Sequence, residues 1–147
     1  LEKLRAREEL RRGRAENAAD IALVLLQTDP TDEAALGLLV TAWQRAGRTD
    51  EAITWLCGQL DQRPGDPMML DQYVRLLLRE DRADEAEAIL DERLAANPND
   101  FASLRLLELS YQIQGRDADM VDLAEQRLLT RPQGTRRALQ LAAEWQL

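Results

Sequence analysis

Residues 31–64, TDEAALGLLVTAWQRAGRTDEAITWLCGQLDQRP, contain one complete copy of a unit that recurs along the chain. The closing proline of this unit belongs to a set spaced by 34 residues: Pro30, Pro64, Pro98 and Pro132. A unit of this length accommodates two short helices, which cannot bury their apolar faces alone but form a continuous core when three or more copies stack. The spacing therefore predicts an array of helix pairs.

Other positions share the same period. A leucine lies four residues before each proline: Leu26, Leu60, Leu94 and Leu128. An arginine follows each predicted turn inside a pair: Arg14, Arg48, Arg82 and Arg116. Three of these arginines follow a glycine, and Asp81 precedes the fourth. Glycine ends helices readily because it adopts the left-handed conformation at little cost. These positions therefore mark the turns between paired helices.

The segments between the turns have apolar residues three and four apart, which is typical of amphipathic helices. Each proline disfavours the helical conformation in the residue before it, so helices end there. Three sites then offer helix caps: Thr31 or Asp32, Asp66 or Pro67, and Asn99 or Asp100. We expect helices near 2–12, 16–28, 32–46, 50–62, 67–79, 83–96, 100–114, 118–130 and 134–147.

The second repeat resembles the tetratricopeptide repeat family. It has the large, small, aromatic, turn and closing residues of that family's pattern: Leu36, Leu39, Val40, Trp43, Gly47, Ala52, Leu56 and Pro64. The third repeat has Leu70, Tyr73, Val74, Leu77, Ala86, Leu90 and Pro98. The resemblance implies an all-α fold, a right-handed α-solenoid of antiparallel helix pairs. It divides one repeat domain, 1–147, at about 1–30, 31–64, 65–98 and 99–132, followed by an unpaired helix over 134–147.

Some positions depart from the family pattern. Glu108 replaces a small residue between the two helices of the fourth repeat, and three polar residues replace a usual alanine late in the second helices: Gln59, Arg93 and Arg127. The first helix of the first repeat matches least well, because Leu1, Leu4 and Leu10 are out of step and Glu9 occupies the aromatic position. Such a helix is either a cap or a helix that belongs with a preceding unit.

The chain begins with Leu1 instead of methionine, so we expect it to be a fragment of a longer protein. The last predicted helix, 134–147, has apolar residues but no pairing helix, whereas finished arrays end in a polar outer face. Either a longer solenoid continues there, or the helix is a docking surface. In both cases we expect self-association through it.

The composition argues against catalysis. The chain has no histidine, which is the commonest general base near neutral pH and the commonest metal ligand. The single cysteine, Cys57, lacks a histidine to activate it, so its position favours a small apolar filler. Carboxylates are plentiful but at ordinary exposed helical spacings, and no glycine-rich phosphate loop is present. We expect no enzyme activity, no cofactor and no metal.

The resemblance also implies a binding surface, since first helices in that family line a concave groove. The positions that carry over are Thr41, Gln44, Arg45, Met68, Asp71, Gln72, Arg75, Arg79, Arg105, Leu109, Gln112 and Arg136. Arginines gather among them although the net charge of the chain is −8. Arginine offers paired donors to carboxylates, which favours an extended acidic peptide. The alternative is that these arginines pair with Asp71 and other neighbours and contribute solubility only.

Nucleic acid is a poorer candidate partner. An acidic chain with 4% aromatic residues provides neither a long basic track nor a stacking platform. The exception is a cluster near the amino end: Arg5, Arg7, Arg11, Arg12 and Arg14. Glutamates are interleaved with it, which favours a salt-bridged helix surface. The longest apolar run, near Ile21 to Leu26, is too short to span a membrane, so we expect no membrane insertion.

These observations predict a non-catalytic scaffold that presents a groove to a protein or peptide. The alternative is a structural spacer in a longer solenoid, which associates with itself or supports a separate enzyme or transport domain. The resembling family often supports such domains in bacterial envelope and secretion systems. The sequence does not choose between these functions.

Overall fold

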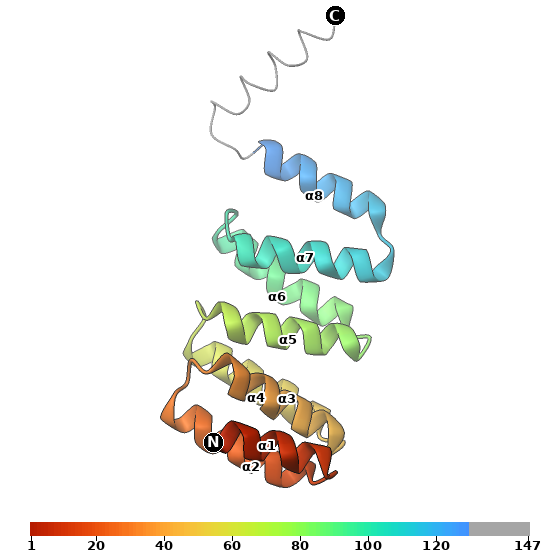
Figure 1. The fold of residues 1–147 in the computed structure, drawn as a ribbon. Coiled ribbons are helices and arrows are strands. Elements are labelled where there is room, and N and C mark those ends of the chain that lie inside the picture. Colours follow the sequence, from red (N-terminus) through yellow and green to blue (C-terminus); the bar gives the residue numbers. More distant parts are fainter. Residues whose placement is uncertain (130–147) are drawn as a thin grey trace, which may run out of the picture. The chain divides into compact units, whose positions relative to one another are not determined.

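The structure is a computed structural model that describes residues 1–129, and those residues form eight helices (Figure 1). Their bounds are α1 (Glu2–Arg11), α2 (Ala15–Thr28), α3 (Glu33–Arg45), α4 (Thr49–Gln62), α5 (Pro67–Arg79), α6 (Ala83–Ala96), α7 (Phe101–Gln114) and α8 (Asp117–Leu129). The chain divides into two compact units, Leu1–Ala86 and the part from Glu87 onward, with the division inside α6.

The all-α helix-pair fold is confirmed, and residues 1–129 contain no strand. Each of the first eight expected helices differs from the observed one by at most one residue at either end. The expected helix over 134–147 lies outside the described residues. The agreement is close because the period fixes both the turns and the caps.

Three aspartates spaced by 34 residues cap the first helices of successive pairs. Asp32 accepts from the Ala35 amide at 3.1 Å, and Asp66 accepts from the Met68 amide at 3.0 Å. Asp100 plays the same part before α7. Each carboxylate satisfies amide groups that have no partner inside the helix and favours the positive end of its dipole. The caps are therefore the aspartates, and not the Thr, Pro or Asn beside them.

The turns inside the pairs adopt the left-handed conformation that the glycines predict. Gly13, Gly47 and Gly115 have φ of +77°, +74° and +67°. Asp81 takes the same conformation with φ of 56°, although it has a side chain. The repeat therefore imposes this backbone even where glycine is absent.

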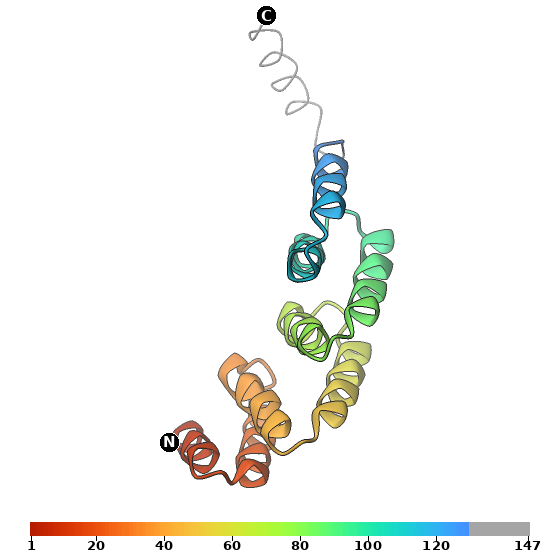
Figure 2. The same ribbon diagram turned by 90° about the vertical axis from the view of Figure 1, so that its right-hand side faces the viewer.

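The unit Leu1–Ala86 has two rows of helices. The first helices α1, α3 and α5 form one row, in which α1 contacts α3 and α3 contacts α5, while α2 and α4 form the other (Figure 2). Apolar side chains fill the space between the rows, among them Leu36, Leu39 and Leu70, none of which is exposed. Their burial provides the main driving force for packing in this unit.

The unit from Glu87 onward packs in part through polar groups. Ser103 and Ser110 of α7 are completely buried, and both are hydrogen-bonded. Ser110 donates to Glu87 of α6 at 2.8 Å, and Arg116 donates to the same carboxylate at 2.8 Å. No buried side-chain nitrogen or oxygen of the described residues lacks a partner. The unit therefore satisfies the polar groups that it buries.

The periodic arginines join helices of successive pairs. Arg48 contacts Glu51 of its own helix and Glu16 of α2, at 2.5 and 2.6 Å. Arg82 repeats this arrangement with Glu85 and Asp50, at 2.6 and 3.2 Å. The hydrogen bond from Arg48 is the main cause that lowers the pKa of Glu51, and the pKa of Arg48 is raised in return. The recurrence of these arginines thus reflects bonds between repeats.

Candidate functional site

The row of first helices in the unit Leu1–Ala86 carries the predicted binding positions on α3 and α5. Eight of them belong to this unit, on two helices that contact each other: Thr41, Gln44, Arg45, Met68, Asp71, Gln72, Arg75 and Arg79. Arg105, Leu109 and Gln112 lie on α7 in the other unit. Arg136 lies outside the described residues. The two groups are therefore separate candidate surfaces on the two units.

Two arginines of this row already have partners. Arg75 donates through Nε to Asp71 at 2.8 Å, one helical turn earlier in α5. Arg45 donates to the carbonyl oxygen of Leu10 at 3.2 Å, near the end of α1. Thr41 donates to the carbonyl oxygen of Gly37 at 2.7 Å. These side chains are positioned by the protein itself, and a ligand would have to share or replace their bonds.

Other cations have no such bond. Arg7, Arg79 and Arg105 are exposed and form no hydrogen bond or ion pair with any described residue. Every other arginine within residues 1–129 has at least one such partner. All three are on first helices. Within residues 1–129, the arginines that form no such bond are therefore confined to first helices.

Arg7 was missed by the sequence analysis. The first helix matched the family pattern poorly, so no groove position was assigned to it. Arg7 nevertheless lies 34 residues before Thr41 and 68 before Arg75, at the same place in its repeat. Continuing the period backwards from Thr41 would have found it. The neighbouring cluster is salt-bridged as expected, since Arg11 and Arg12 both contact Glu8, each at 2.7 Å.

Lys3 is a further cation of α1 at a groove register. Its ammonium lies 2.6 Å from the Asp32 carboxylate that caps α3. The hydrogen bond from Lys3 is the main cause that holds the pKa of Asp32 below its usual value of 3.8. Lys3 therefore joins α1 to α3.

The polar departures from the repeat pattern are bonded within the protein. Arg127 of α8 donates to Glu108 of α7, so that two unusual residues meet each other. Arg93 donates to Asp100 at 3.3 Å and to Ser103 at 3.2 Å. The sequence identified both departures but not the pairing. These residues connect helices in the unit from Glu87 onward.

Residues 1–129 were found to lack a cluster of metal-ligating side chains. That part of the chain contains no group of three or more His, Cys, Asp or Glu side chains that could hold a metal ion. None of its helices combines the length and the apolar character needed to cross a membrane. Cys57 is half-buried beside Tyr73, whose pKa is raised first by burial and then by the neighbouring thiol.

Solved structures share this arrangement of helices. A MamA RS-1 ArsTM double mutant is 23% identical, with a TM-score of 0.52, over 85% of this chain and 70% of that one. MamA 41-end from Desulfovibrio magneticus RS-1 is also 23% identical, with a TM-score of 0.51, over 85% of this chain and 71% of that one. The fold is that of the tetratricopeptide repeats. The tetratricopeptide fold thus agrees with the 34-residue period and the capped helix pairs.

Two further comparisons gave a match to part of this chain and a weaker structural similarity. The family model described as Bacterial transcriptional activator domain matches residues 2–56, which cover α1 to α3 and half of α4. The first TPR domain of the human RPAP3 protein is 14% identical, with a TM-score of 0.49, over 80% of this chain and 93% of that one. No curated protein matches the chain.

Proposed function

We propose that this chain is a non-catalytic interaction scaffold whose first helices, in each of the two units, bind acidic, extended segments of a protein partner. The observation that carries the proposal is the confinement of unbonded described arginines to first helices, at Arg7, Arg79 and Arg105. An ionised carboxylate bonds most strongly to a cation that does not already serve another group. In a chain of net charge −8, such cations also attract acidic segments selectively.

The neighbouring side chains support a peptide instead of a small anion. Met68 and Gln72 of α5 are half-buried, and each lies seven residues, or about two turns, before one of the arginines Arg75 and Arg79. They offer an apolar contact and an amide to a main chain that passes across the helices. Because Arg75 already bonds Asp71, an incoming carboxylate would exchange partners there, whereas it would meet Arg79 directly. Arg79 is therefore the stronger anchor.

A peptide-display selection tests this proposal. We expect the unmodified chain to enrich peptides rich in Asp and Glu. A variant with Arg7→Gln, Arg79→Gln and Arg105→Gln should bind those peptides about tenfold or more weakly, since charged hydrogen bonds contribute about 1.5–3 kcal/mol each. The control carries Arg5→Gln, Arg12→Gln and Arg14→Gln, which removes the same charge from arginines that are already paired. Circular dichroism checks that both variants fold.

Equal binding by the two triple variants would contradict the proposal, because the loss of three positive charges from any part of the chain would then explain the weaker binding. The match of residues 2–56 to the Bacterial transcriptional activator domain model makes proteins of the transcription machinery sensible partners to test after the peptides. Selection of peptides without acidic residues would also contradict the proposal that the first helices bind acidic segments.

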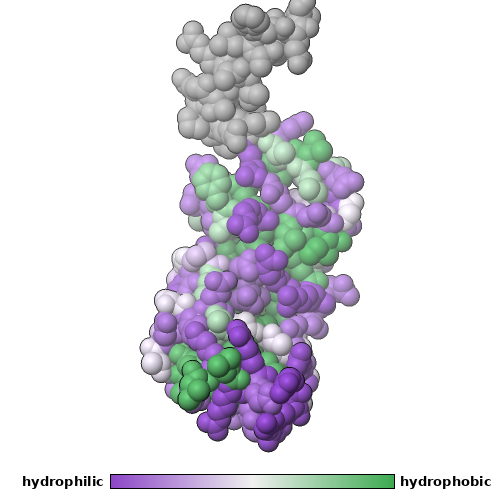
Figure 3. All heavy atoms as spheres, viewed as in Figure 1, coloured by the Kyte–Doolittle hydropathy of each residue, from purple (hydrophilic) through white to green (hydrophobic). Residues whose placement is uncertain are grey.

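A structural spacer is the second candidate, and one observation favours it. Leu1 and Leu4 of the amino-terminal region are 100% and 63% exposed. Figure 3 shows an apolar patch among polar atoms in the lower part of the view. Exposed apolar side chains that gather in one place favour contact with another protein surface. Sedimentation velocity should then show association that increases with concentration, and Leu4→Glu should reduce it. A monomer at all concentrations would exclude self-association through this patch.

A further inference from the structure

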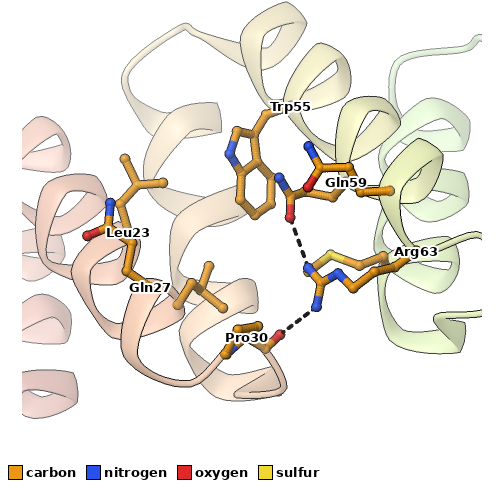
Figure 4. A pocket seen from close by; sticks show the side chains of 9 residues that line it. Leu23, Gln27, Pro30, Trp55, Gln59 and Arg63 are labelled. Atoms are coloured by element: carbon orange, nitrogen blue, oxygen red, sulfur yellow. Dashed lines mark hydrogen bonds between the residues drawn. The ribbon is translucent and has the colours of Figure 1, made fainter.

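The unit Leu1–Ala86 contains a pocket of about 440 Å³ between α2 and α4, to which Met69 of α5 also contributes (Figure 4). The residues that line it are Leu23, Leu26, Gln27, Pro30, Trp55, Gln59, Gln62, Arg63 and Met69. Ligand pockets of proteins commonly have volumes of about 300–1,000 Å³ and combine apolar walls with a few polar groups. This pocket meets both conditions.

Trp55, which forms part of the apolar wall of this pocket, packs against a second tryptophan. Trp55 packs edge to face on Trp43, with ring centroids 5.8 Å apart and planes at 69°. Trp43 is itself buried, and Arg48 covers its ring at 5.9 Å from the centroid. Aromatic pairs of this geometry are favourable beyond their buried area. The indole of Trp55 therefore forms a fixed face for an apolar group in the pocket.

Arg63 supplies the only charge in the lining. Its guanidinium donates to Gln59 at 2.9 Å and reaches the Pro30 carbonyl at 3.4 Å, as Figure 4 shows. Asp66 lies 3.5 Å from the same group, at the long end of an ion pair. A guanidinium has five N–H donors, and two of these three contacts are long, so donor capacity remains. The side chain is 33% exposed and can meet a carboxylate from outside.

The other unit has a smaller pocket at the same place in the repeat. It measures about 150 Å³ and includes Leu94, Pro98, Leu123 and Arg127. These residues lie 68 positions after Leu26, Pro30, Trp55 and Gln59. The repeat geometry thus makes a hollow at this position in both units. In the unit Leu1–Ala86, Trp55 and Gln59 line the larger pocket. In the other unit, Leu123 and Arg127 take these places in the smaller pocket, and Arg127 is bonded to Glu108.

We propose that the pocket between α2 and α4 binds a partner peptide in which a carboxylate side chain adjoins a bulky apolar side chain. The apolar side chain packs on Trp55, and the carboxylate accepts from Arg63. Both groups must come from adjacent residues, because a pocket of 440 Å³ holds little more than one large side chain and its neighbour. The glutamines at the rim, Gln27 and Gln62, can bond the peptide main chain. This site does not depend on the proposed function of the first helices.

Three blocked dipeptides test the site without any mutation. Ac-Glu-Phe-NH₂ should shift the NMR signal of the Trp55 indole N–H, assigned from a Trp55→Phe sample, at concentrations up to about 10 mM. Ac-Gln-Phe-NH₂ removes the charge, and Ac-Glu-Ala-NH₂ removes the ring. Each should bind about tenfold more weakly, because a charged hydrogen bond or a buried aromatic side chain is lost. No shift with the first dipeptide, or equal binding of all three, overturns the proposal.

Variants then locate the binding. Arg63→Gln removes the charge of the side chain and leaves a shorter polar one in its place. We expect about tenfold weaker binding of Ac-Glu-Phe-NH₂ in this variant. The control Arg79→Gln, on the first-helix row, should leave binding unchanged. Unchanged binding in Arg63→Gln overturns the proposal, and loss in Arg79→Gln would move the site to the first helices.

Discussion

The two units pack their helices in different ways. Up to Ala86, the position early in each first helix that faces the paired helix holds Ala6, Val40 or Val74, and none of them is more than 2% exposed. In the unit from Glu87 onward the corresponding position is Glu108, which is bonded to Arg127. One backbone repeat is therefore compatible with apolar and with ionic packing.

This difference shows what the repeat requires at these positions. An apolar residue stabilises the fold because its burial removes apolar surface from water. A buried polar residue lowers the stability of the fold unless it has a hydrogen-bond partner. The polar side chains of the second unit meet that condition through Arg93, Arg127 and the bonds around Glu87. We therefore expect the stability of the first unit to depend most on the volume of its buried side chains, and the stability of the second unit to depend more on its charged side chains.

The largest expected effect is in the apolar unit. Leu36→Ala should reduce the free energy of unfolding by about 2–5 kcal/mol, because the side chain is completely buried and its removal leaves a cavity. Leu104→Ala, at the matching place in the other unit, should cost closer to about 2 kcal/mol, since Leu104 lines an open pocket and is 6% exposed. Urea unfolding followed by circular dichroism measures both. A larger loss from Leu104→Ala would reverse the comparison.

The next effect concerns charge in the second unit. Burial alone would raise the pKa of Glu87, but hydrogen bonds from Ser110, Gln114 and Arg116 outweigh it and hold the pKa below 4.5. A carboxyl group whose pKa is lowered by folding stabilises the fold at pH values above its pKa in the unfolded chain. This contribution is lost as the pH falls through its pKa in the folded protein. Glu87→Gln should therefore cost about 1–3 kcal/mol at neutral pH.

As the pH falls through the lowered pKa of Glu87, the difference from the unmodified chain should shrink, because Glu87 itself becomes protonated. Unfolding in urea at neutral pH and at an acidic pH below that pKa tests this sign. A constant difference at both values would show that the charge of Glu87 is not what stabilises the unit.

The smallest effect is at the turn before α6. Asp81→Gly should raise stability by about 0.5–1 kcal/mol, because φ of 56° strains a residue with a side chain and not glycine. Gly47→Ala is the matched opposite, at φ of +74° with open space around the added carbon, and should lower stability by a similar amount. Thermal unfolding of both variants compares them. A loss of stability in Asp81→Gly would mean that its side chain stabilises the turn.

Much of the fold could be predicted because a repeat states the same information several times. The 34-residue period gave the helix bounds to within one residue, and the capping sites could be narrowed to two residues each. The free cations Arg79 and Arg105 were also among the predicted binding residues. Arg7 was not, because α1 lacks the aromatic residue by which its register would have been recognised.

By itself, the sequence determined the helix pairs, their turns and the positions at which side chains meet other helices. These features depend on spacing and on local backbone preferences, which are encoded residue by residue. The tertiary structure alone decided which polar residues bond each other, as Arg127 does with Glu108, and that Trp55 and Arg63 share a pocket. The bond between Arg127 and Glu108 joins α8 to α7, and the pocket lies between α4 and α2. Both depend on distances between helices that no local pattern in the chain expresses.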